Sequence, residues 1–378
     1  MWYTNARIFT PTGYMHGSFE VQDGRFVTII PEKTDDRHAI DLCGAKVIPG
    51  LVDIHTHGNS GADFSDGDLP GLQRMARYLA RQGVTSFAPT SMTLPYETLA
   101  KAFETARELH EKRPTDCARV MGIHMEGPFF SEAKKGAQNA AYLQKPDFDA
   151  FETLQNGCGD LIRIADVAPE LEGAIQFTEK AKTLCRVSVA HTDANYDQAK
   201  AVFEAGATHI THLFNGMPPI HHRKPGVIGA GSEREDVTAE LICDGLHVHP
   251  SAVRMAFRLF PGRICLISDA LRCCGMPEGT YSLGGQTVTL KDRAARLPDG
   301  TLAGSVVSLA DCLRNAVAFG IPEADAIQSA TMIPAKEINA GDQIGAIKPG
   351  KLADFIVCDD DLKPVRVFID GEEVLLQD

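Results

Sequence analysis

The middle of the chain alternates between short apolar runs and longer amphipathic stretches. Residues 68–82 and 96–112 space Leu, Ala and Met at helical intervals. The apolar runs end in polar, often ionisable residues, and eight of them lie at 46–54, 84–89, 120–125, 161–167, 186–190, 208–213, 240–243 and 264–268. Buried strands that alternate with helices are typical of an α/β fold with a parallel sheet. Eight such strands predict a (β/α)8, TIM-like barrel.

Both ends of the chain follow a different pattern. Short strands are expected at 6–10, 18–21, 26–30, 354–358 and 365–369. Asp23-Gly24, between two of these segments, is typical of a hairpin turn. The length of 378 residues exceeds the ~250–300 that usually share one hydrophobic core. We therefore expect one large domain with a smaller one, or two domains.

The composition indicates which classes of partner and which cellular compartment to expect. The net charge is −13, with 37 Lys and Arg against 50 Asp and Glu, and this argues against a nucleic-acid partner. The first residues lack a signal-peptide pattern, and no run approaches the ~18 apolar residues of a membrane span. The ten cysteines form no CxxC pair, and several lie inside apolar runs. We therefore expect a cytoplasmic protein with reduced thiols and no membrane partner.

Ionisable residues gather where the predicted strands end. They are His55 and His57 after the first run, Glu126 after the third, His191 after the fifth, His212 in the sixth and Asp269 after the eighth. Because the carboxyl ends of all eight strands of such a barrel meet at one face, these side chains are expected to converge there. Imidazole and carboxylate are ligands of Zn²⁺ and Fe²⁺, so the pattern predicts a divalent metal site.

The two histidine pairs differ in their spacing. His55 and His57 are two residues apart in a strand, so both rings point to the same face. His209 and His212 are three apart, and in a strand only one of them can point at the barrel axis. We treat His209 as structural, together with His124, His221, His222 and His249.

Four further segments are informative: HMEGPF at 124–129, THLFNGM at 211–217, CDGLHVH at 243–249 and LAGS at 302–305. They resemble segments of the N-acetylglucosamine-6-phosphate deacetylases, a branch of the amidohydrolase superfamily. The HxH motif, the histidines of strands five and six and the aspartate of strand eight match the superfamily pattern. The resemblance runs in order from Ala6 to about Gly371.

The resemblance implies a fold and a reaction. The family fold is a barrel that carries a small β-sandwich built from both chain ends, which places the sandwich at 1–50 and 336–378 and the barrel at 51–335. The family reaction removes acetate from N-acetyl-D-glucosamine 6-phosphate and gives D-glucosamine 6-phosphate. Members that keep the HxH motif can hold two metal ions and others hold one, so one or two ions per subunit, Zn²⁺ or Fe²⁺, are expected here.

The resemblance also assigns roles. Glu126, His191 and His212 are expected to hold the main metal, and His55 and His57 join Glu126 around a second ion. Asp269 is the expected general base. The expected contacts of the sugar phosphate are Ala137, Gln138, Asn215, Gly216, Arg223, His247, Leu302, Ala303 and Gly304. In the family the loop that carries Arg223 can cross to a neighbouring subunit, which predicts a homodimer.

One position departs from the family pattern. Gln138 stands in a GAQN segment where some members have a histidine near the substrate. Glutamine can donate a hydrogen bond, but it cannot carry a proton, so any electrophilic role there passes to the metal.

Two other functions are conceivable for a barrel with these residues. A cyclic-amide hydrolase of the dihydroorotase type usually bridges its metals with a carboxylated lysine after strand four, and the IADVAPE segment at 164–170 has no lysine. A catalytically dead barrel kept as a scaffold would tend to lose metal ligands first, and this chain retains all of them together with Asp269.

Overall fold

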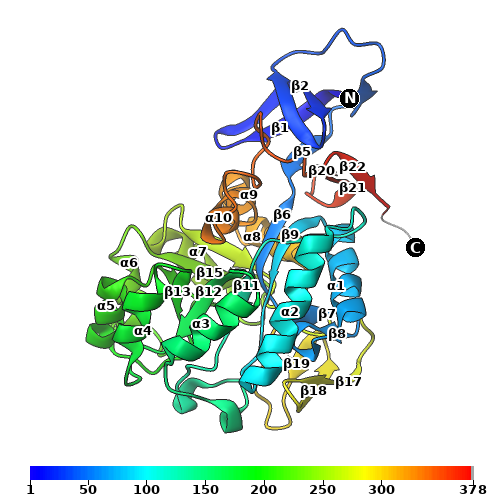
Figure 1. Ribbon diagram of the computed structural model, residues 1–378. Helices are drawn as coiled ribbons and strands as arrows, with labels where there is room; N and C mark the ends of the chain where they lie inside the picture. Colours follow the sequence, from blue (N-terminus) through cyan, green and yellow to red (C-terminus); the bar gives the residue numbers. More distant parts are fainter. Residues whose placement is uncertain (376–378) are drawn as a thin grey trace.

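Both ends of the chain meet in one mixed sheet of eight strands in the computed structural model, which describes residues 1–375. The strands are β1 (Trp2–Thr10), β2 (Gly13–Gln22), β3 (Arg25–Ile30), β4 (Ile40–Asp41), β5 (Lys46–Pro49), β20 (Phe355–Cys358), β21 (Pro364–Ile369) and β22 (Glu372–Val374). β20 pairs antiparallel with β5, so the C-terminal hairpin continues the N-terminal strands. The two β-rich ends therefore form one unit at one end of the molecule (Figure 1).

The middle of the chain forms a curled parallel sheet. Its strands are β6 (Leu51–Thr56), β9 (Val84–Pro89), β10 (Arg119–Val120), β11 (Ile123–Met125), β12 (Ile162–Val167), β13 (Arg186–Val189), β14 (His209–Ile210), β15 (Thr238–Ile242) and β16 (Ile264–Ile267). They pair in two groups, β10-β9-β6 and β11 to β16. Single parallel bridges from Thr56 to Ala270 and from Thr90 to His124 connect the two groups.

Helices cover the outside of this sheet (Figure 1). They are α1 (Leu69–Arg81), α2 (Tyr96–Lys112), α3 (Phe148–Gly157), α4 (Ala174–Ala181), α5 (Tyr196–Ala205), α6 (Gly226–Ser232), α7 (Pro250–Leu259), α8 (Leu309–Ala318), α9 (Glu323–Ser329) and α10 (Met332–Glu337), with short 3₁₀ turns at Phe64–Asp66, Glu132–Lys134 and Ala140–Tyr142. The helices expected at 68–82 and 96–112 are α1 and α2. No helix among residues 1–375 is long and apolar enough to cross a bilayer.

Two of the expected apolar runs are divided. The first splits at Gly50 into β5, which belongs to the terminal sheet, and β6, which opens the parallel sheet. A side chain at residue 50 would meet Thr85 at 2.2 Å, so a glycine is needed where the chain passes between the two sheets. The third run is interrupted at Met121-Gly122, between β10 and β11.

A small antiparallel sheet was not expected from the sequence. β17 (Gly279–Leu283), β18 (Gln286–Lys291) and β19 (Ala294–Arg296) follow β16, at the end of the molecule opposite the terminal sheet (Figure 1). Leu283, Val288 and Leu290 pack in one cluster with Met92 and other residues at the carboxyl ends of the parallel strands. The short pair β7 (Gly58–Asn59) and β8 (Ala62–Asp63) follows β6.

Candidate active site

The parallel strands deliver ionisable side chains to one end of the sheet. Glu126 directly follows β11, and His191, His212 and Asp269 each lie two residues beyond the end of a strand. The last three have positive φ angles of 42°, 30° and 48°. Residues other than glycine rarely adopt a backbone conformation with positive φ. Where they do, the position is often part of a functional site. The backbone therefore leaves the strand direction at each of these positions.

One carboxylate oxygen of Glu126 and one ring nitrogen each of His191 and His212 lie close together. Its Oε1 lies 3.1 Å from Nε2 of His191 and 3.0 Å from Nε2 of His212, and these two nitrogens are 3.1 Å apart. All three residues are buried, with at most 7% of their surface exposed. Two imidazoles and a carboxylate in this arrangement form a set that a divalent cation can occupy.

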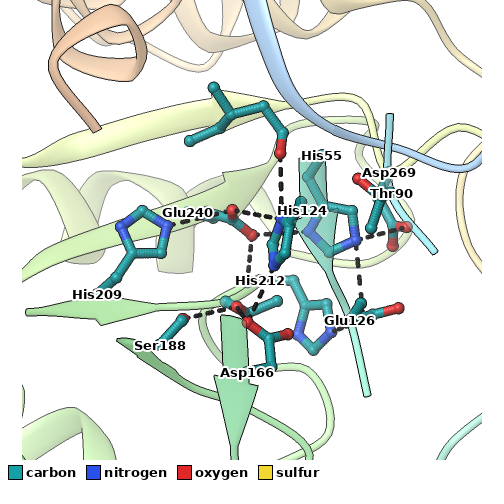
Figure 2. Close-up of polar contacts among 12 residues, drawn as sticks. His55, Thr90, His124, Glu126, Asp166, Ser188, His209, His212, Glu240 and Asp269 are labelled. Carbon is teal, nitrogen blue, oxygen red and sulfur yellow. Dashed lines mark hydrogen bonds and ion pairs between the residues drawn. The ribbon is translucent and has the colours of Figure 1, made fainter. Parts of the chain in front are cut away.

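A second group shares the same carboxylate. Nε2 of His57 lies 3.3 Å from Oε2 of Glu126, and Nε2 of His55 lies 3.7 Å from Oε1. The two Nε2 atoms are 3.4 Å apart. Asp269 Oδ1 lies 3.3 Å from Nε2 of His57 and 3.5 Å from Nε2 of His55. Glu126 thus stands between two sets of imidazoles, and Asp269 faces one of them. Figure 2 shows one ring of each set, His55 and His212, with Glu126.

The other ring nitrogens explain why the Nε2 lone pairs point inward. Nδ1 of His57 donates to the carbonyl of Thr90 at 3.1 Å, and Nδ1 of His191 donates to the carbonyl of Lys134 at 2.9 Å. Nδ1 of His55 donates to Glu240 at 2.8 Å. An Nδ1–H donated to an oxygen leaves Nε2 as an acceptor, which is the tautomer that a metal-binding histidine needs. These residues therefore fit a divalent metal.

Hydrogen bonds between the carboxylates and the histidines shift the pKa values of both at this site. Burial alone would raise the pKa of Glu126, but hydrogen bonds from three histidines bring it well below its usual value. Burial alone would lower the pKa of His212, yet Glu126 raises it to about 9. His57 responds in the same way: its hydrogen bonds to Asp269 and Glu126 outweigh burial and raise its pKa. The carboxylates are therefore ionised and strongly attract positive charge, and a divalent cation bound between them would displace the Nε2 protons of these histidines.

The expectation for His209 and His212 was wrong in one respect. Strand β14 ends at Ile210, so the alternation of faces does not extend to His212. His212 has a φ of 30° and turns toward Glu126, whereas His209 lies in the interior and contacts Glu240 at 3.2 Å. Both rings are fully or almost fully buried, at 0% and 4% exposure. Both therefore point inward, at different depths.

A pocket of about 300 Å³ opens over these side chains. Among its lining residues are thirteen of those expected from the sequence: His57, Glu126, Ala137, Gln138, His191, His212, Asn215, Gly216, His247, Asp269, Leu302, Ala303 and Gly304. His55 lies beneath the pocket and is fully buried. Met92, Gly136, Leu246 and Thr301 also line it and were not anticipated. Each of these except Met92 adjoins an expected residue in the chain.

Two polar side chains in this pocket are held in place by their neighbours. Gln138 is 3% exposed; its Nε2 donates to Glu126 Oε2 at 2.6 Å, and its Oε1 accepts from the amide of Thr93 at 2.7 Å. Nδ1 of His247 lies 2.6 Å from Asp244, whose other oxygen accepts two backbone amides. Gln138 therefore orients the carboxylate that the two histidine sets share.

Arg223 does not reach this pocket within the single chain. It is exposed in the loop between β14 and α6, and its Nη1 lies 2.7 Å from Nε2 of His222. Its predicted role in phosphate binding is therefore not visible in one copy of the chain.

Comparison with known proteins agrees with this geometry. The model of the amidohydrolase family matches residues 46–374. The chain belongs to the amidohydrolase family. This amidohydrolase is 34% identical to an N-acetylglucosamine-6-phosphate deacetylase of Bacillus subtilis over 94% of its own length and 92% of the relative's. It is also 34% identical to an N-acetylgalactosamine-6-phosphate deacetylase of Escherichia coli O157:H7, over 97% of each chain.

Solved structures extend this likeness to three dimensions. An aspartate-to-alanine mutant of the N-acetyl-D-glucosamine-6-phosphate deacetylase from Mycobacterium smegmatis, in complex with N-acetyl-D-glucosamine 6-phosphate, matches with a TM-score of 0.93. It is 31% identical to this amidohydrolase, and the match covers 99% of each chain. The curled sheet and its terminal strands therefore follow the arrangement of deacetylases in this family.

Proposed function

We propose that this amidohydrolase removes acetate from N-acetyl-D-glucosamine 6-phosphate and releases D-glucosamine 6-phosphate. The observation that carries the proposal is the convergence of imidazole Nε2 atoms and the Glu126 carboxylate beneath a pocket of sugar-phosphate size. Relatives with this name match nearly the whole chain at about one-third identity. Amide hydrolysis needs an activated water, a proton for the leaving amine and stabilisation of an oxyanion.

The proposal includes the family architecture. We propose that the curled parallel sheet is an eight-stranded (β/α)8 barrel and that the terminal strands form a β-sandwich. We place the barrel domain at 51–335 and the sandwich domain at 1–50 and 336–378, of which 376–378 lie outside the described residues; the second boundary falls inside α10. The single bridges at Thr56 and Thr90 support closure of the barrel, since they join its two strand groups. The passage of the chain between two sheets at Gly50 supports the first boundary.

A divalent metal would be held by two overlapping sets of residues. Glu126, His191 and His212 form the main set, and His55 and His57 share Glu126 in the second. A divalent cation in such a set acts as a Lewis acid and acidifies water. Nitrogen and carboxylate donors suit Zn²⁺ and Fe²⁺, so we propose one of these metals, with one or two ions per subunit.

Asp269 is the proposed general base. Its carboxylate faces the pocket; burial alone would raise its pKa, but the hydrogen bond with His57 and the electrostatic effect of the neighbouring imidazoles lower it. An ionised carboxylate can accept the proton of the attacking water. The same group can then deliver that proton to the departing amine, so that one residue serves both halves of the reaction.

The remaining pocket residues would bind the sugar phosphate. Asn215 and His247 offer polar side chains, and Ala137 and Gly216 offer backbone groups. The segment 302–304 also lines the pocket, through Leu302, Ala303 and Gly304. Gln138 donates to Glu126 in this structure, so we propose that it orients the carboxylate as well as contacting substrate.

Arg223 would bind the phosphate across a homodimer interface. A guanidinium can hold phosphate with two hydrogen bonds, and the exposed loop leaves Arg223 available to a partner's pocket. Arg223→Ala should then raise KM for the phosphorylated sugar and leave turnover of unphosphorylated N-acetylglucosamine almost unchanged. Steady-state kinetics on both sugars checks this, and equal losses on the two would remove Arg223 from phosphate binding.

We further propose that the protein works in the cytoplasm. Nine of its ten cysteines are buried free thiols. Burial raises the pKa of several of them, for example that of Cys117 to about 11, so they remain protonated and unreactive. This usage of cysteine is typical of proteins from a reducing compartment.

The galactosamine epimer is a second candidate substrate, because the relative that acts on it is as similar as the glucosamine enzyme of Bacillus subtilis. The decisive experiment measures acetate release from both N-acetylated hexosamine 6-phosphates, with elemental analysis of the same preparation. We expect release from the glucosamine compound and close to one or two equivalents of Zn or Fe. Absence of release from either compound by metal-loaded protein would overturn the proposed function.

A further inference from the structure

A second cavity lies at the opposite end of the parallel strands. Its volume is about 270 Å³, close to the 300 Å³ of the candidate active site. Arg119 begins β10, and Arg163 is the second residue of β12, so both side chains come from the amino ends of strands. Glu126 and Asp269 lie at the carboxyl ends. The two cavities therefore occupy opposite ends of the same sheet.

The lining of this cavity is basic. Arg113, Arg119, Arg163 and His110 contribute to it, together with Asn339 and Gln343. None of the described residues that line it is acidic. This is unusual in a chain of net charge −13, because carboxylates outnumber basic groups over the whole molecule. The cavity is therefore a local concentration of positive charge.

One of the three arginines is already paired. Arg119 is 6% exposed and forms ion pairs with Asp354, at very short range, and with Asp370, whose Oδ2 lies 2.9 Å from Nη1. Both carboxylates belong to the terminal-sheet region of the chain. Burial lowers the pKa of Arg119, and the nearby charge of Arg113 lowers it further. Arg119 thus fixes one wall of the cavity and contributes little uncompensated charge.

The other two arginines have no such partner. Within residues 1–375, the side chains of Arg113 and Arg163 make no hydrogen bond or ion pair. Nε of Arg163 is buried and unsatisfied, and so is Nε of Arg119. A buried guanidinium N–H without an acceptor is costly, and native proteins supply it with a partner. Arg163 is half-buried and Arg113 is exposed, so both unpaired guanidinium groups are available to an anion in the cavity.

The backbone makes room for Arg163. A side chain at Gly122 would meet Cγ of Arg163 at 2.3 Å, so the glycine at the break between β10 and β11 lets the arginine stem cross this position. Asn339 and Gln343 add uncharged polar groups to the lining of the cavity. The lining therefore combines cationic groups with neutral groups that can form hydrogen bonds.

We propose that this cavity binds a phosphoryl group, either free phosphate or a phosphate ester of sugar size, at the junction of the terminal sheet and the parallel sheet. Arg113 and Arg163 hold the phosphoryl oxygens, since guanidinium groups bind phosphate with paired hydrogen bonds. Asn339, Gln343 and His110 face the rest of an ester. The inference rests on this cavity alone and does not depend on the deacetylase reaction.

Equilibrium dialysis of the metal-loaded protein tests the proposal. The probes are glucosamine 6-phosphate, inorganic phosphate and glucosamine. We expect the wild type to bind one more molecule of a phosphorylated probe per chain than the double variant Arg113→Gln/Arg163→Gln. The affinity of the variant at that site should be at least ~10-fold lower. Glucosamine should show no such difference. Equal binding of both phosphorylated probes by wild type and variant would overturn the proposal.

The probes also separate the two sources of a phosphoryl group. If inorganic phosphate alone accounts for the extra molecule, the ligand is the free ion; if glucosamine 6-phosphate binds and inorganic phosphate does not, the ligand is an ester. Arg77→Gln/Arg107→Gln is a matched control, since it removes two exposed charges from the neighbouring helices α1 and α2. It should bind like the wild type.

Thermal unfolding measurements distinguish a loss of phosphate binding from a loss of folding. Arg113 is exposed at the end of α2, so Arg113→Gln alone should fold normally and still bind the phosphorylated probe more weakly. Phosphate should raise the Tm of the wild type more than that of either Arg113 variant. An identical Tm increase in all three proteins would count against the site. The kcat for acetate release should stay unchanged, because neither arginine lies near Glu126.

Discussion

Two clusters of carboxylates and imidazoles lie inside the parallel sheet, one around Glu126 and one around Glu240 (Figure 2). In the cluster around Glu240, His209 faces a carboxylate with each ring nitrogen, Glu337 at 3.0 Å and Glu240 at 3.2 Å. His124 likewise faces the carbonyl of Ile54 at 3.1 Å and Asp166 at 2.9 Å. Both nitrogens of each ring must donate, so these rings are cationic and have no lone pair for a metal.

In the cluster around Glu126, Nε2 of the histidines points at the shared carboxylate, so a divalent cation that displaces the Nε2 proton would find a lone pair there. His57 and His191 use Nδ1 for a backbone carbonyl and turn Nε2 toward the shared carboxylate. This cluster also opens into the pocket, whereas Glu240 is completely buried. The residue types alone therefore do not make a metal site. The direction of the unshared lone pairs and access from solvent distinguish a site from an internal salt-bridge network.

His55 belongs to both clusters and connects them. Its Nδ1 donates to Glu240 at 2.8 Å, and its Nε2 faces Glu126 at 3.7 Å. Glu240 also accepts the backbone amide of His212 at 3.1 Å. The closed network around Glu240 therefore orients two of the proposed metal ligands, one through its side chain and one through its backbone.

The largest effect is expected from Glu126→Gln. Glutamine is nearly isosteric but uncharged, so both sets of imidazoles lose the carboxylate that they share. We expect metal content near zero and acetate release lower by more than the ~10²-fold typical of a lost acid–base group. Elemental analysis and the acetate assay measure both. Glu132→Gln, in the nearby 3₁₀ turn, is the control, and full metal content in Glu126→Gln would contradict the assignment.

Asp269→Asn should separate chemistry from metal binding. Asparagine keeps the shape of the side chain but cannot accept the proton of the attacking water. We expect the fold and the metal to be retained while kcat falls by at least ~10². Stopped assays of acetate at saturating substrate give kcat, and near-wild-type turnover would remove Asp269 as the base.

Glu240→Gln should produce a smaller and selective loss. The amide oxygen still accepts one hydrogen bond, but the charge that holds Nδ1–H of His55 is gone. Outer partners of metal ligands typically change metal affinity by ~10–100-fold. We therefore expect weaker binding of an ion by His55 and His57, seen in competition with a chelator, while the set of His191 and His212 remains loaded. Unchanged affinity for every ion would break the link between the two clusters.

Much of the candidate site could be predicted because it depends on local pattern. Apolar runs that end in ionisable residues mark the carboxyl ends of parallel strands, and Glu126, His191 and Asp269 all lie at such ends. Strand alternation failed for the pair His209 and His212, because it was applied beyond the end of β14, although His212 itself lies beside Glu126 as expected. Side-chain direction there depends on a φ angle of 30°, which the sequence does not reveal.

Other features depend on contacts between distant segments. The β17–β19 sheet was missed, although Gly284-Gly285 between two alternating segments is typical of a hairpin turn. The basic cavity has no sequence signature, because Arg113, Arg163 and Asn339 meet only when three separate elements pack together. The tautomer of each histidine likewise depends on carbonyl groups from other strands.

The smallest effect on turnover, and the most direct test of the cationic interior, is expected from His209→Gln. Burial would lower the pKa of His209, but Glu240 and Glu337 raise it to about 9, above the ~6.5 of an unfolded chain. The ring's charge therefore stabilises the fold fully below pH 6.5, and this contribution is lost as the pH rises through 9. It corresponds to about 3 kcal/mol in the free energy of unfolding.

Urea denaturation at pH 6.5 and pH 9 should show that the free energy of unfolding of the wild type decreases between these two pH values. In His209→Gln this decrease should be smaller by about 3 kcal/mol. The exposed His16→Gln serves as the control. Parallel pH dependence in His209→Gln and the wild type would mean that the ring is neutral, and the contrast between the two clusters would then no longer hold.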